Sequence, residues 1–218
     1  DCLSREKIPF VIMSDNNILE DILVIKFTTL LRSIADLSNE SELAKTLFLD
    51  FLGLKIEDVF RLTNYAYKNR ASIVDVLNSD KRISEVGIED VGKLQEVFRL
   101  IKDLAKIGKN ELLTESFEKI ARKAGLRHHG IHLTNTLHPL TTIAALFDFM
   151  RSVVEGNRNA RLYDFIQKLD LIASYKKGLK RKSVSAPRGL IRLMTAHKSK
   201  GLEFDVVFKA FRLMSSHQ

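Results

Sequence analysis

The sequence predicts a mainly α fold, in which a helical domain is bracketed by a few short β-strands of an incomplete α/β sheet. Two observations support this class. Apolar residues recur at three- and four-residue spacing through most of residues 18–175, a period typical of amphipathic helices. Short apolar runs with β-branched residues near the two ends, at 10–13, 190–194 and 204–208, do not belong to such a helical period, and each predicts a strand. We therefore expect the helices to be inserted between strands that meet in space.

The individual elements follow from the sequence in order. A strand is expected at Phe10–Met13, and Gly53 and Gly125 each follow a periodic segment, as is common just past a helix end. Thr114 and Asn159 are the expected N-caps of two later helices. Helices are predicted over 18–37, 41–52, 56–67, 72–77, 88–107, 114–124, 138–156 and 160–175.

The bulk composition is that of an ordinary globular protein. Hydrophobic residues make up 45% and charged residues 28% of the 218 residues. No apolar run is long enough to span a bilayer, and no signal peptide is visible. The single cysteine, Cys2, excludes an internal disulfide framework and fits a reducing, cytoplasmic compartment. Because the chain starts at Asp1 and already resembles the middle of a fold, we expect a piece of a longer protein.

The net charge of +8 comes from one segment of the chain. Residues 171–202 contain no acidic residue and nine basic ones, so the remainder of the chain nets −1, which is 8 minus 9. Such a concentrated cationic strip suits a polyanion such as a nucleic-acid backbone. The alternative is a solvated, flexible linker, which Gly178, Ser183 and Pro187 favour. The nine residues are Lys176, Lys177, Lys180, Arg181, Lys182, Arg188, Arg192, Lys198 and Lys200.

A histidine-rich segment at 127–132 invites a metal interpretation that its composition does not support. It has no cysteine and no nearby acidic residue, and Gly130 interrupts the helix that would align His128 with His132. Metal sites in catalytic proteins need three well-placed ligands. We therefore expect no metal site here, even with His138 nearby.

The most specific pattern in the chain is the polar segment between the last two predicted strands. The segment 194–208 has the sequence MTAHKSKGLEFDVVF and resembles motif V of the UvrD/Rep/RecB-type helicases of superfamily 1. In that family an apolar strand leads into Thr-x-His-x-x-Lys-Gly-Leu-Glu-Phe, followed by a second apolar strand. The matching residues are Thr195, His197, Lys200, Gly201, Leu202, Glu203 and Phe204.

The resemblance implies a domain organisation. Residues 1–14 and 189–218 would be parts of the second RecA-like subdomain, called 2A in this family. The segment at 7–12 is similar to the one these helicases carry before their helical insertion. Residues 15–175 would then be the inserted helical 2B subdomain, which matches by position, length and helicity only. Residues 176–188 would be a basic linker between them.

The resemblance also implies roles for the polar residues. Thr195 and His197 would contact single-stranded DNA, and a hydroxyl and an imidazole can indeed donate hydrogen bonds to phosphate oxygens. Glu203 would contact the ribose of ATP, with Lys200 and Gly201 near the nucleotide. We further expect the basic linker to contact the DNA backbone through Lys176, Lys177, Lys180, Arg181 and Lys182.

The parent protein would then be an ATP-dependent DNA helicase or translocase. It would use ATP and Mg²⁺, bind single-stranded and duplex DNA, and work with protein partners in repair or recombination. The sequence contains no Gly-x-x-x-x-Gly-Lys-[Ser/Thr] phosphate loop, no Asp-Glu pair after an apolar strand, and none of the family's later arginine motif. We therefore expect the isolated chain not to hydrolyse ATP.

Two alternatives stay open at this point. The first is one subunit of a helicase–nuclease, similar to RecB or AddA, because the residues that would distinguish it lie outside this chain. The second is a helical module that binds another protein and has no motor activity.

Overall fold

The computed structural model describes residues 2–6, 8, 10–13, 17–125, 138–175, 178–179 and 191–208. The chain divides into two compact units, one formed by residues 1–14 with 185–218 and the other by residues 15–184. Most of the elements in the described residues are helices, and the strands among them are β1 and β2. The prediction of a mainly α fold is therefore confirmed.

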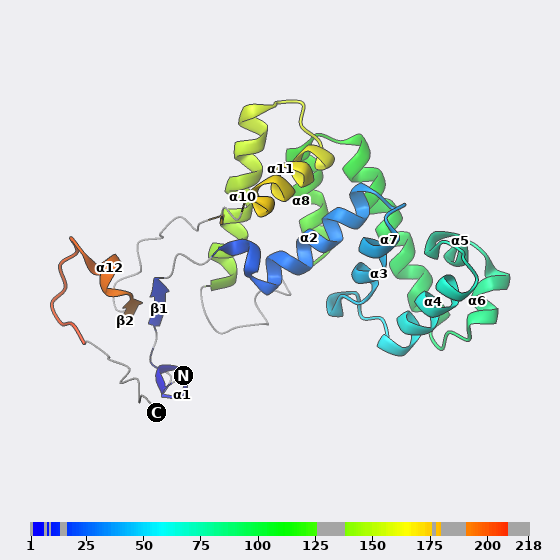
Figure 1. Cartoon of the computed structure of the whole chain (residues 1–218), viewed down its shortest axis with the longest axis horizontal. Coiled ribbons are helices and arrows are strands. Elements are labelled where there is room, and N and C mark those ends of the chain that lie inside the picture. Colours follow the sequence, from blue (N-terminus) through cyan, green and yellow to red (C-terminus); the bar gives the residue numbers. More distant parts are fainter. Residues whose placement is uncertain are drawn as a thin grey trace, which may run out of the picture. The chain divides into compact units, whose positions relative to one another are not determined.

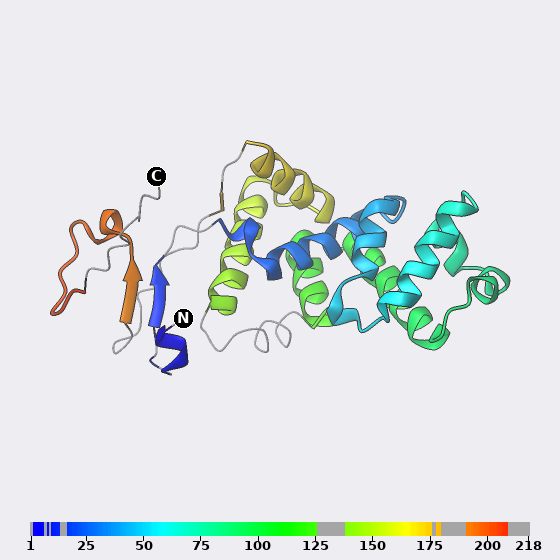
Figure 2. The ribbon, with the colours of Figure 1, turned by 60° about the horizontal axis from the view of Figure 1, so that its bottom comes forward.

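The unit formed by the two chain ends contains a parallel strand pair. Its elements are α1 (Cys2–Arg5), β1 (Phe10–Met13), β2 (Ile191–Met194) and α12 (Ala196–Ser199). β1 and β2 run side by side with Phe10 opposite Ile191 and Met13 opposite Met194 (Figure 2). Parallel neighbours need a crossover connection, and here that connection is the whole helical unit. The expected meeting of the two ends in one sheet is confirmed.

The helical unit is built from two groups of helices. In Figure 1, α2, α8, α10 and α11 gather in one group, α4, α5 and α6 form a second, and α7 extends from the first toward the second. The elements of the helical unit are η1 (Ile18–Glu20), α2 (Ile22–Ala35), α3 (Glu40–Leu47), η2 (Asp50–Leu52), α4 (Ile56–Lys68), α5 (Ile73–Leu77), α6 (Asp80–Val86), α7 (Val91–Asn110), α8 (Leu113–Lys123), α10 (His138–Gly156) and α11 (Leu162–Ser174).

A cluster of phenylalanines joins the helices of the first group. The ring of Phe117 on α8 lies 5.5 Å from Phe27 on α2, 5.0 Å from Phe147 on α10 and 5.2 Å from Phe165 on α11, measured between ring centroids. These pairs are edge-on, the arrangement that the aromatic quadrupole favours. Because Phe27, Phe117 and Phe165 are almost fully buried, this cluster is the centre of the core.

The two ends of the helical unit are hydrogen-bonded to each other. The N–H of Ile18 donates to the carbonyl of Leu179 at 2.9 Å, and the N–H of Leu179 donates to Oδ1 of Asn17 at 3.0 Å. The chain therefore enters and leaves the helical unit at one place. This is the geometry that an insertion between two neighbouring strands requires.

Several predicted boundaries differ from the observed ones. The helix predicted over 18–37 is interrupted at Asp21, whose carboxylate accepts the N–H of Leu23 at 3.0 Å and starts α2 one turn later. The helix predicted over 41–52 ends at Leu47, and a separate 3₁₀ turn follows. The short helices α1 and α6 were not predicted from the sequence.

The two predicted N-caps, Thr114 and Asn159, are wrong. The first helix begins at Leu113, whose N–H donates to the carbonyl of Ala160 at 2.8 Å, so a distant backbone group satisfies it. The second begins after Arg161, whose own N–H donates to the Asp164 carboxylate at 2.8 Å. The expected glycines are confirmed, because Gly53 and Gly125 both have the left-handed φ values, 67° and 68°, that favour glycine.

Candidate nucleic-acid and nucleotide interface

The motif residues form a tight helical turn directly after strand β2. Thr195 is the last extended residue, with φ −74° and ψ 153°, and its carbonyl accepts the N–H of Ser199 at 3.2 Å. The residues that follow make the single turn α12 (Ala196–Ser199). The hydroxyl of Thr195 makes no hydrogen bond to the first turn of this helix. It can therefore donate to an acceptor outside the turn.

Glycine is required where the turn ends. Gly201 has φ 82°, in the left-handed region, where an L side chain is strained. The N–H of Leu202 donates to the carbonyl of Ser199 at 3.1 Å and closes the turn. Glycine at this position therefore permits the backbone turn.

The polar side chains of this turn face the solvent. Thr195, Lys200 and Glu203 are all exposed, and Phe204 is half-buried. Within the part of the chain that the structure describes, no ion pair involves Lys200 or Glu203. His197 lies in the same turn, as the second residue of α12. The turn and the residues directly after it thus carry an exposed hydroxyl, imidazole, ammonium and carboxylate, which are donors and acceptors suited to phosphate and sugar oxygens.

The strand predicted at 204–208 does not form. The structure gives these residues no regular secondary structure, and Val206, Val207 and Phe208 are 70%, 61% and 93% exposed. An apolar parallel strand is stable only when neighbours pair with its backbone and cover its faces. Among the described residues β2 is paired with β1 alone, so no such neighbour is present on this side.

Two of the expectations from the sequence concern residues outside the described ranges. The segment Lys176, Lys177, Lys180, Arg181 and Lys182, expected to bind DNA, lies there, and so does the histidine-rich segment at 127–132. In the ranges that the structure does describe, no group of three His, Cys, Asp or Glu residues is arranged to hold a metal ion.

A buried carboxylate that the sequence did not predict organises the second helix group. The Asp58 side chain is almost fully buried and accepts the backbone N–H groups of Glu89 at 2.9 Å and Asp90 at 3.1 Å. Burial alone would raise the pKa of Asp58, but these two hydrogen bonds and the guanidinium of Arg61 outweigh it and hold that pKa below its ordinary value. Arg61 also donates to the carbonyl of Gly87 at 3.0 Å.

This network is structural in character. Lys55 donates to Glu89 at 2.9 Å, and its ammonium, followed by the guanidinium of Arg61, lowers the pKa of the Glu89 carboxyl. The same contact raises the pKa of Lys55. Every charge in the network has a partner inside it, and Asp58 accepts from backbone groups. The network fixes the segment before α7 and leaves no group free for chemistry.

Comparison with known proteins defines the class. Residues 2–211 match the UvrD-like helicase C-terminal domain. The chain belongs to this family.

Individual relatives are similar over most of the chain. The ATP-dependent DNA helicase PcrA of Staphylococcus aureus (strain Mu50 / ATCC 700699) is 25% identical over 183 residues, which are 82% of this chain and 24% of that protein. An ATP-dependent helicase/nuclease subunit of Latilactobacillus sakei is 23% identical over 95% of this chain and 24% of its own length. Its counterpart in Carboxydothermus hydrogenoformans is 24% identical over 94% of this chain and 17% of its own length. The chain thus spans about a quarter of these relatives or less.

In the part of the chain that the structure describes, no helix is both long enough and apolar enough to cross a bilayer.

Proposed function

We propose that this chain is part of an ATP-dependent DNA helicase or translocase. Within that motor it supplies contacts to single-stranded DNA, one edge of the ATP cleft and a regulatory helical subdomain that binds duplex DNA. The observation that carries the proposal is the turn 195–203, which has the residue types and spacing of motif V and lies inside the region that matches the helicase family.

The two ends of the turn suit different ligands. Thr195 and His197 carry hydrogen-bond donors at the end of β2, and donors at a fixed strand end can position a phosphate backbone without distinguishing bases. Glu203 offers acceptors that repel phosphate but suit ribose hydroxyls, and Lys200 adds a cation beside Gly201. A short turn that touches both ligands would couple closure of the nucleotide cleft to the grip on DNA.

The residues present fit only the edge of a bound nucleotide. ATP supplies the phosphoryl group and Mg²⁺ neutralises its charge, and both need a phosphate-binding loop and an acidic metal ligand pair. The sequence holds neither, while Glu203 and Lys200 are exposed and suit sugar and outer contacts. In the parent protein ATP and Mg²⁺ would therefore bind mainly through residues outside this chain.

The domain organisation follows the same proposal. Residues 1–14 and 189–218 correspond to parts of a RecA-like 2A subdomain, 15–175 to its helical 2B insertion and 176–188 to a basic linker. The parallel pairing of β1 with β2 supports the first assignment, and the hydrogen bonds between Leu179 and the Asn17–Ile18 pair support the second.

A DNA-binding measurement tests the proposed role of the turn. Fluorescence anisotropy with a labelled single-stranded oligonucleotide should show salt-dependent binding to the chain. The double variant Thr195→Val with His197→Ala should bind about tenfold more weakly, because it removes two donors to charged oxygens. Thr114→Val, an exposed threonine on α8, is the matched control and should leave the affinity unchanged. Equal affinities for all three proteins would refute the DNA contact.

The basic linker is tested by the salt dependence of the same binding. Replacing its five cations, Lys176, Lys177, Lys180, Arg181 and Lys182, by Ser should weaken binding and flatten the slope of log affinity against log salt, since each lost phosphate contact removes about 0.7 from that slope for a single strand. A slope that stays the same would mean that the segment is only a linker.

Measuring phosphate release from ATP tests whether the isolated chain can hydrolyse ATP. The isolated chain should show no turnover above the protein-free rate, with or without Mg²⁺ and single-stranded DNA, because loop, metal ligands and arginine act together in phosphoryl transfer. Turnover that rises in proportion to protein concentration would contradict this part of the proposal.

One observation favours a second candidate, a helicase–nuclease. The two helicase/nuclease relatives align over 94–95% of this chain, whereas PcrA aligns over 82%. Incubation of the full-length parent protein with linear duplex DNA, ATP and Mg²⁺ separates the candidates. Degradation of the DNA would support the helicase–nuclease, and unwinding without degradation would support the helicase.

A further inference from the structure

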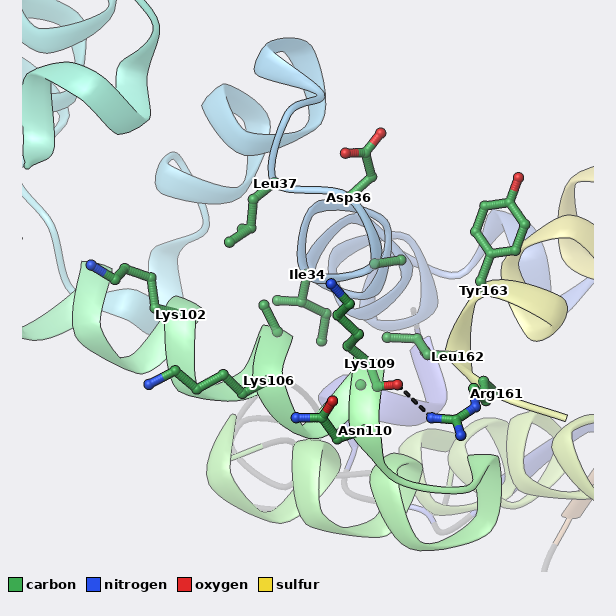
Figure 3. A pocket seen from close by; sticks show the side chains of 13 residues that line it. Ile34, Asp36, Leu37, Lys102, Lys106, Lys109, Asn110, Arg161, Leu162 and Tyr163 are labelled. Atoms are coloured by element: carbon green, nitrogen blue, oxygen red, sulfur yellow. Dashed lines mark hydrogen bonds between the residues drawn. The ribbon is translucent and has the colours of Figure 1, made fainter. Parts of the chain in front are cut away.

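A pocket of the helical unit is not used by the proposed motor function. It lies between the end of α2, the second half of α7 and the start of α11, with a volume of about 660 Å³ (Figure 3). This volume is within the range of sites that hold small ligands or the anchoring side chains of peptides. The pocket belongs entirely to the unit 15–184, whereas the motif turn 195–203 belongs to the other unit.

At the pocket α7 and α11 approach each other closely. A Cβ atom at Gly108 of α7 would lie 2.7 Å from Cδ2 of the buried Leu162, so a larger residue at this position would force the Leu162 side chain to shift. Next to it, the Arg161 guanidinium donates to the carbonyl of Lys109 at 2.6 Å, a contact that Figure 3 shows. The start of α11 is thereby fixed to the end of α7, and the pocket is preformed.

The wall of the pocket is apolar. Ile34 and Leu162 are almost fully buried at its base, and Leu37 and Ala105 are half-buried beside them. Tyr163 lies at the edge of the pocket and is 59% exposed. An apolar side chain entering this space would lose contact with water over most of its surface, which favours binding.

The rim of the pocket carries cations that the described residues leave mostly without carboxylate partners. Lys106 pairs with Asp103 at 3.5 Å, whereas Lys102 contacts the amide oxygen of Asn78, at 3.2 Å, and the Phe98 ring. In the described part of the chain neither Lys109 nor Arg161 forms an ion pair with a carboxylate.

An acidic group on the same rim is already engaged. The carboxylate of Asp36 accepts the N–H and the hydroxyl of Ser38 at 3.0 and 2.6 Å. Arg161 uses one guanidinium N–H on the Lys109 carbonyl and keeps others for a ligand. The rim thus offers several donors with positive charge around an apolar base.

We propose that this pocket, the α2–α7–α11 pocket, binds a short segment of a partner protein in which an apolar side chain is flanked by Asp or Glu. The apolar side chain fills the base between Ile34 and Leu162, and the carboxylates contact Lys109, Arg161 and Lys102. A DNA backbone fits less well, because it carries the charge but has no apolar group for the base. A peptide of this kind satisfies both halves of the pocket.

Fluorescence anisotropy with designed peptides on the whole chain tests the proposal. The probe is a fluorescein-labelled peptide with a Leu-Phe core flanked by Asp and Glu, and its two controls replace the core by Ala or the acidic residues by Lys. Only the probe should bind. Lys109→Glu should weaken its binding about tenfold, since it reverses one charge at the rim. Lys123→Glu, an exposed lysine at the end of α8, makes the same charge change and should leave affinity unchanged.

NMR and circular dichroism show where the peptide binds and whether the variant is folded. Backbone amide NMR shifts on titration should change at the end of α7 and the start of α11 for the probe peptide, and far-UV circular dichroism should show Lys109→Glu to be folded. Equal binding of the core-less peptide, equal binding by Lys109→Glu, or shifts confined to other helices would each overturn the proposal. Displacement of the probe by duplex DNA, with a matching loss of DNA affinity in Lys109→Glu, would overturn it too, by showing that the pocket belongs to a DNA surface.

Discussion

Asp58 joins two parts of the helical unit that are distant in sequence. It lies on α4, and both of its carboxylate oxygens accept backbone N–H groups from the segment that leads into α7, at 2.9 and 3.1 Å. A buried carboxylate is tolerated only when it is hydrogen-bonded or paired, and Asp58 is both, since Arg61 lies 3.4 Å away.

Removing this carboxylate should be strongly destabilising. Asp58→Ala leaves two buried N–H groups without an acceptor, so the free energy of unfolding should fall by about 2–3 kcal/mol, as measured by urea denaturation. Asp103→Ala on α7 removes an exposed carboxylate paired with Lys106 and should change that free energy by less than about 0.5 kcal/mol. Similar losses in the two variants would contradict the assigned role.

The same carboxylate predicts a loss of stability in acid. Its pKa in the folded protein lies below the unfolded value of about 3.9, so the unfolded chain takes up the proton first as pH falls. Its contribution is therefore complete above about pH 5 and is lost progressively through about pH 4 and below. The depressed pKa of Glu89 acts in the same direction.

The Asp58→Asn variant isolates this effect. Between about pH 6 and about pH 3.5, its unfolding free energy should change less than that of the unmodified chain, because an amide does not titrate there. Urea denaturation at several pH values measures both curves. Parallel curves over this interval would show that other carboxylates cause the acid sensitivity.

Residue type and spacing were enough to predict some of these positions and not others. The motif residues Thr195 to Glu203 are adjacent in sequence, so their pattern is visible without a structure. Gly201 is part of the same local pattern, and its φ of 82° in the structure shows why glycine suits this position. Asp58 gives no such sign, because its partners are backbone groups 31 and 32 residues later, and any residue could supply them.

Packing between helices α7 and α11 depends on the missing side chain of Gly108. Glycine within a helix is less stable than alanine by about 1 kcal/mol, so its presence on the packed face needs a reason. The reason is Leu162, which is 1% exposed and would meet a Cβ at 2.7 Å. The same contact defines one wall of the α2–α7–α11 pocket.

Gly108→Ala should therefore destabilise the protein in spite of its better helix propensity. Overpacking costs about 1–3 kcal/mol, against a gain of about 1 kcal/mol, so a net loss of up to about 2 kcal/mol is expected in urea denaturation. Gly92→Ala near the start of the same helix is the control. Its Cβ would meet an Asp90 carboxylate oxygen at 3.7 Å, an ordinary contact, so stability should be equal or higher. The reverse order of stabilities would exclude the clash.

Helices were predicted well where a long apolar period exists and poorly at their ends. The period reflects burial of one face, which is fixed by local sequence. At the start of α8 the N–H of Leu113 donates to the distant carbonyl of Ala160, and just before α11 the N–H of Arg161 donates to the Asp164 side chain. The local cap residues at 114 and 159 were therefore misleading. The strand expected at 204–208 failed for a related reason, since a strand needs partners that its own sequence does not contain.

The topology of the chain is simple, because the helical unit is inserted in the sequence between two strands that pair with each other. The order of apolar patterns along the chain predicted this arrangement, because strands at both ends and helices between them leave few alternatives. The sequence could not predict that the two ends of the helical unit are joined by the hydrogen bond between Asn17 and Leu179. It also could not predict the pocket, whose lining comes from three separate helices.

The hydrogen bonds between the two ends of the helical unit predict that residues 15–184 fold without the strand pair. Among the described residues, the buried core lies between Ile18 and Leu169, and the pairing of Asn17 and Ile18 with Leu179 holds the two ends together. A chain truncated to 15–184 should therefore unfold cooperatively in urea, at the same midpoint as the helical signal of the full chain. A shorter one, 22–175, loses the fully buried Ile18 and its hydrogen-bond partner Leu179, and should be less stable by about 1.5–3 kcal/mol. If the 15–184 chain unfolded without cooperativity, the helices would need the strand pair to fold. If the two truncations were equally stable, Ile18 and the Asn17–Leu179 contact would not stabilise the helical unit.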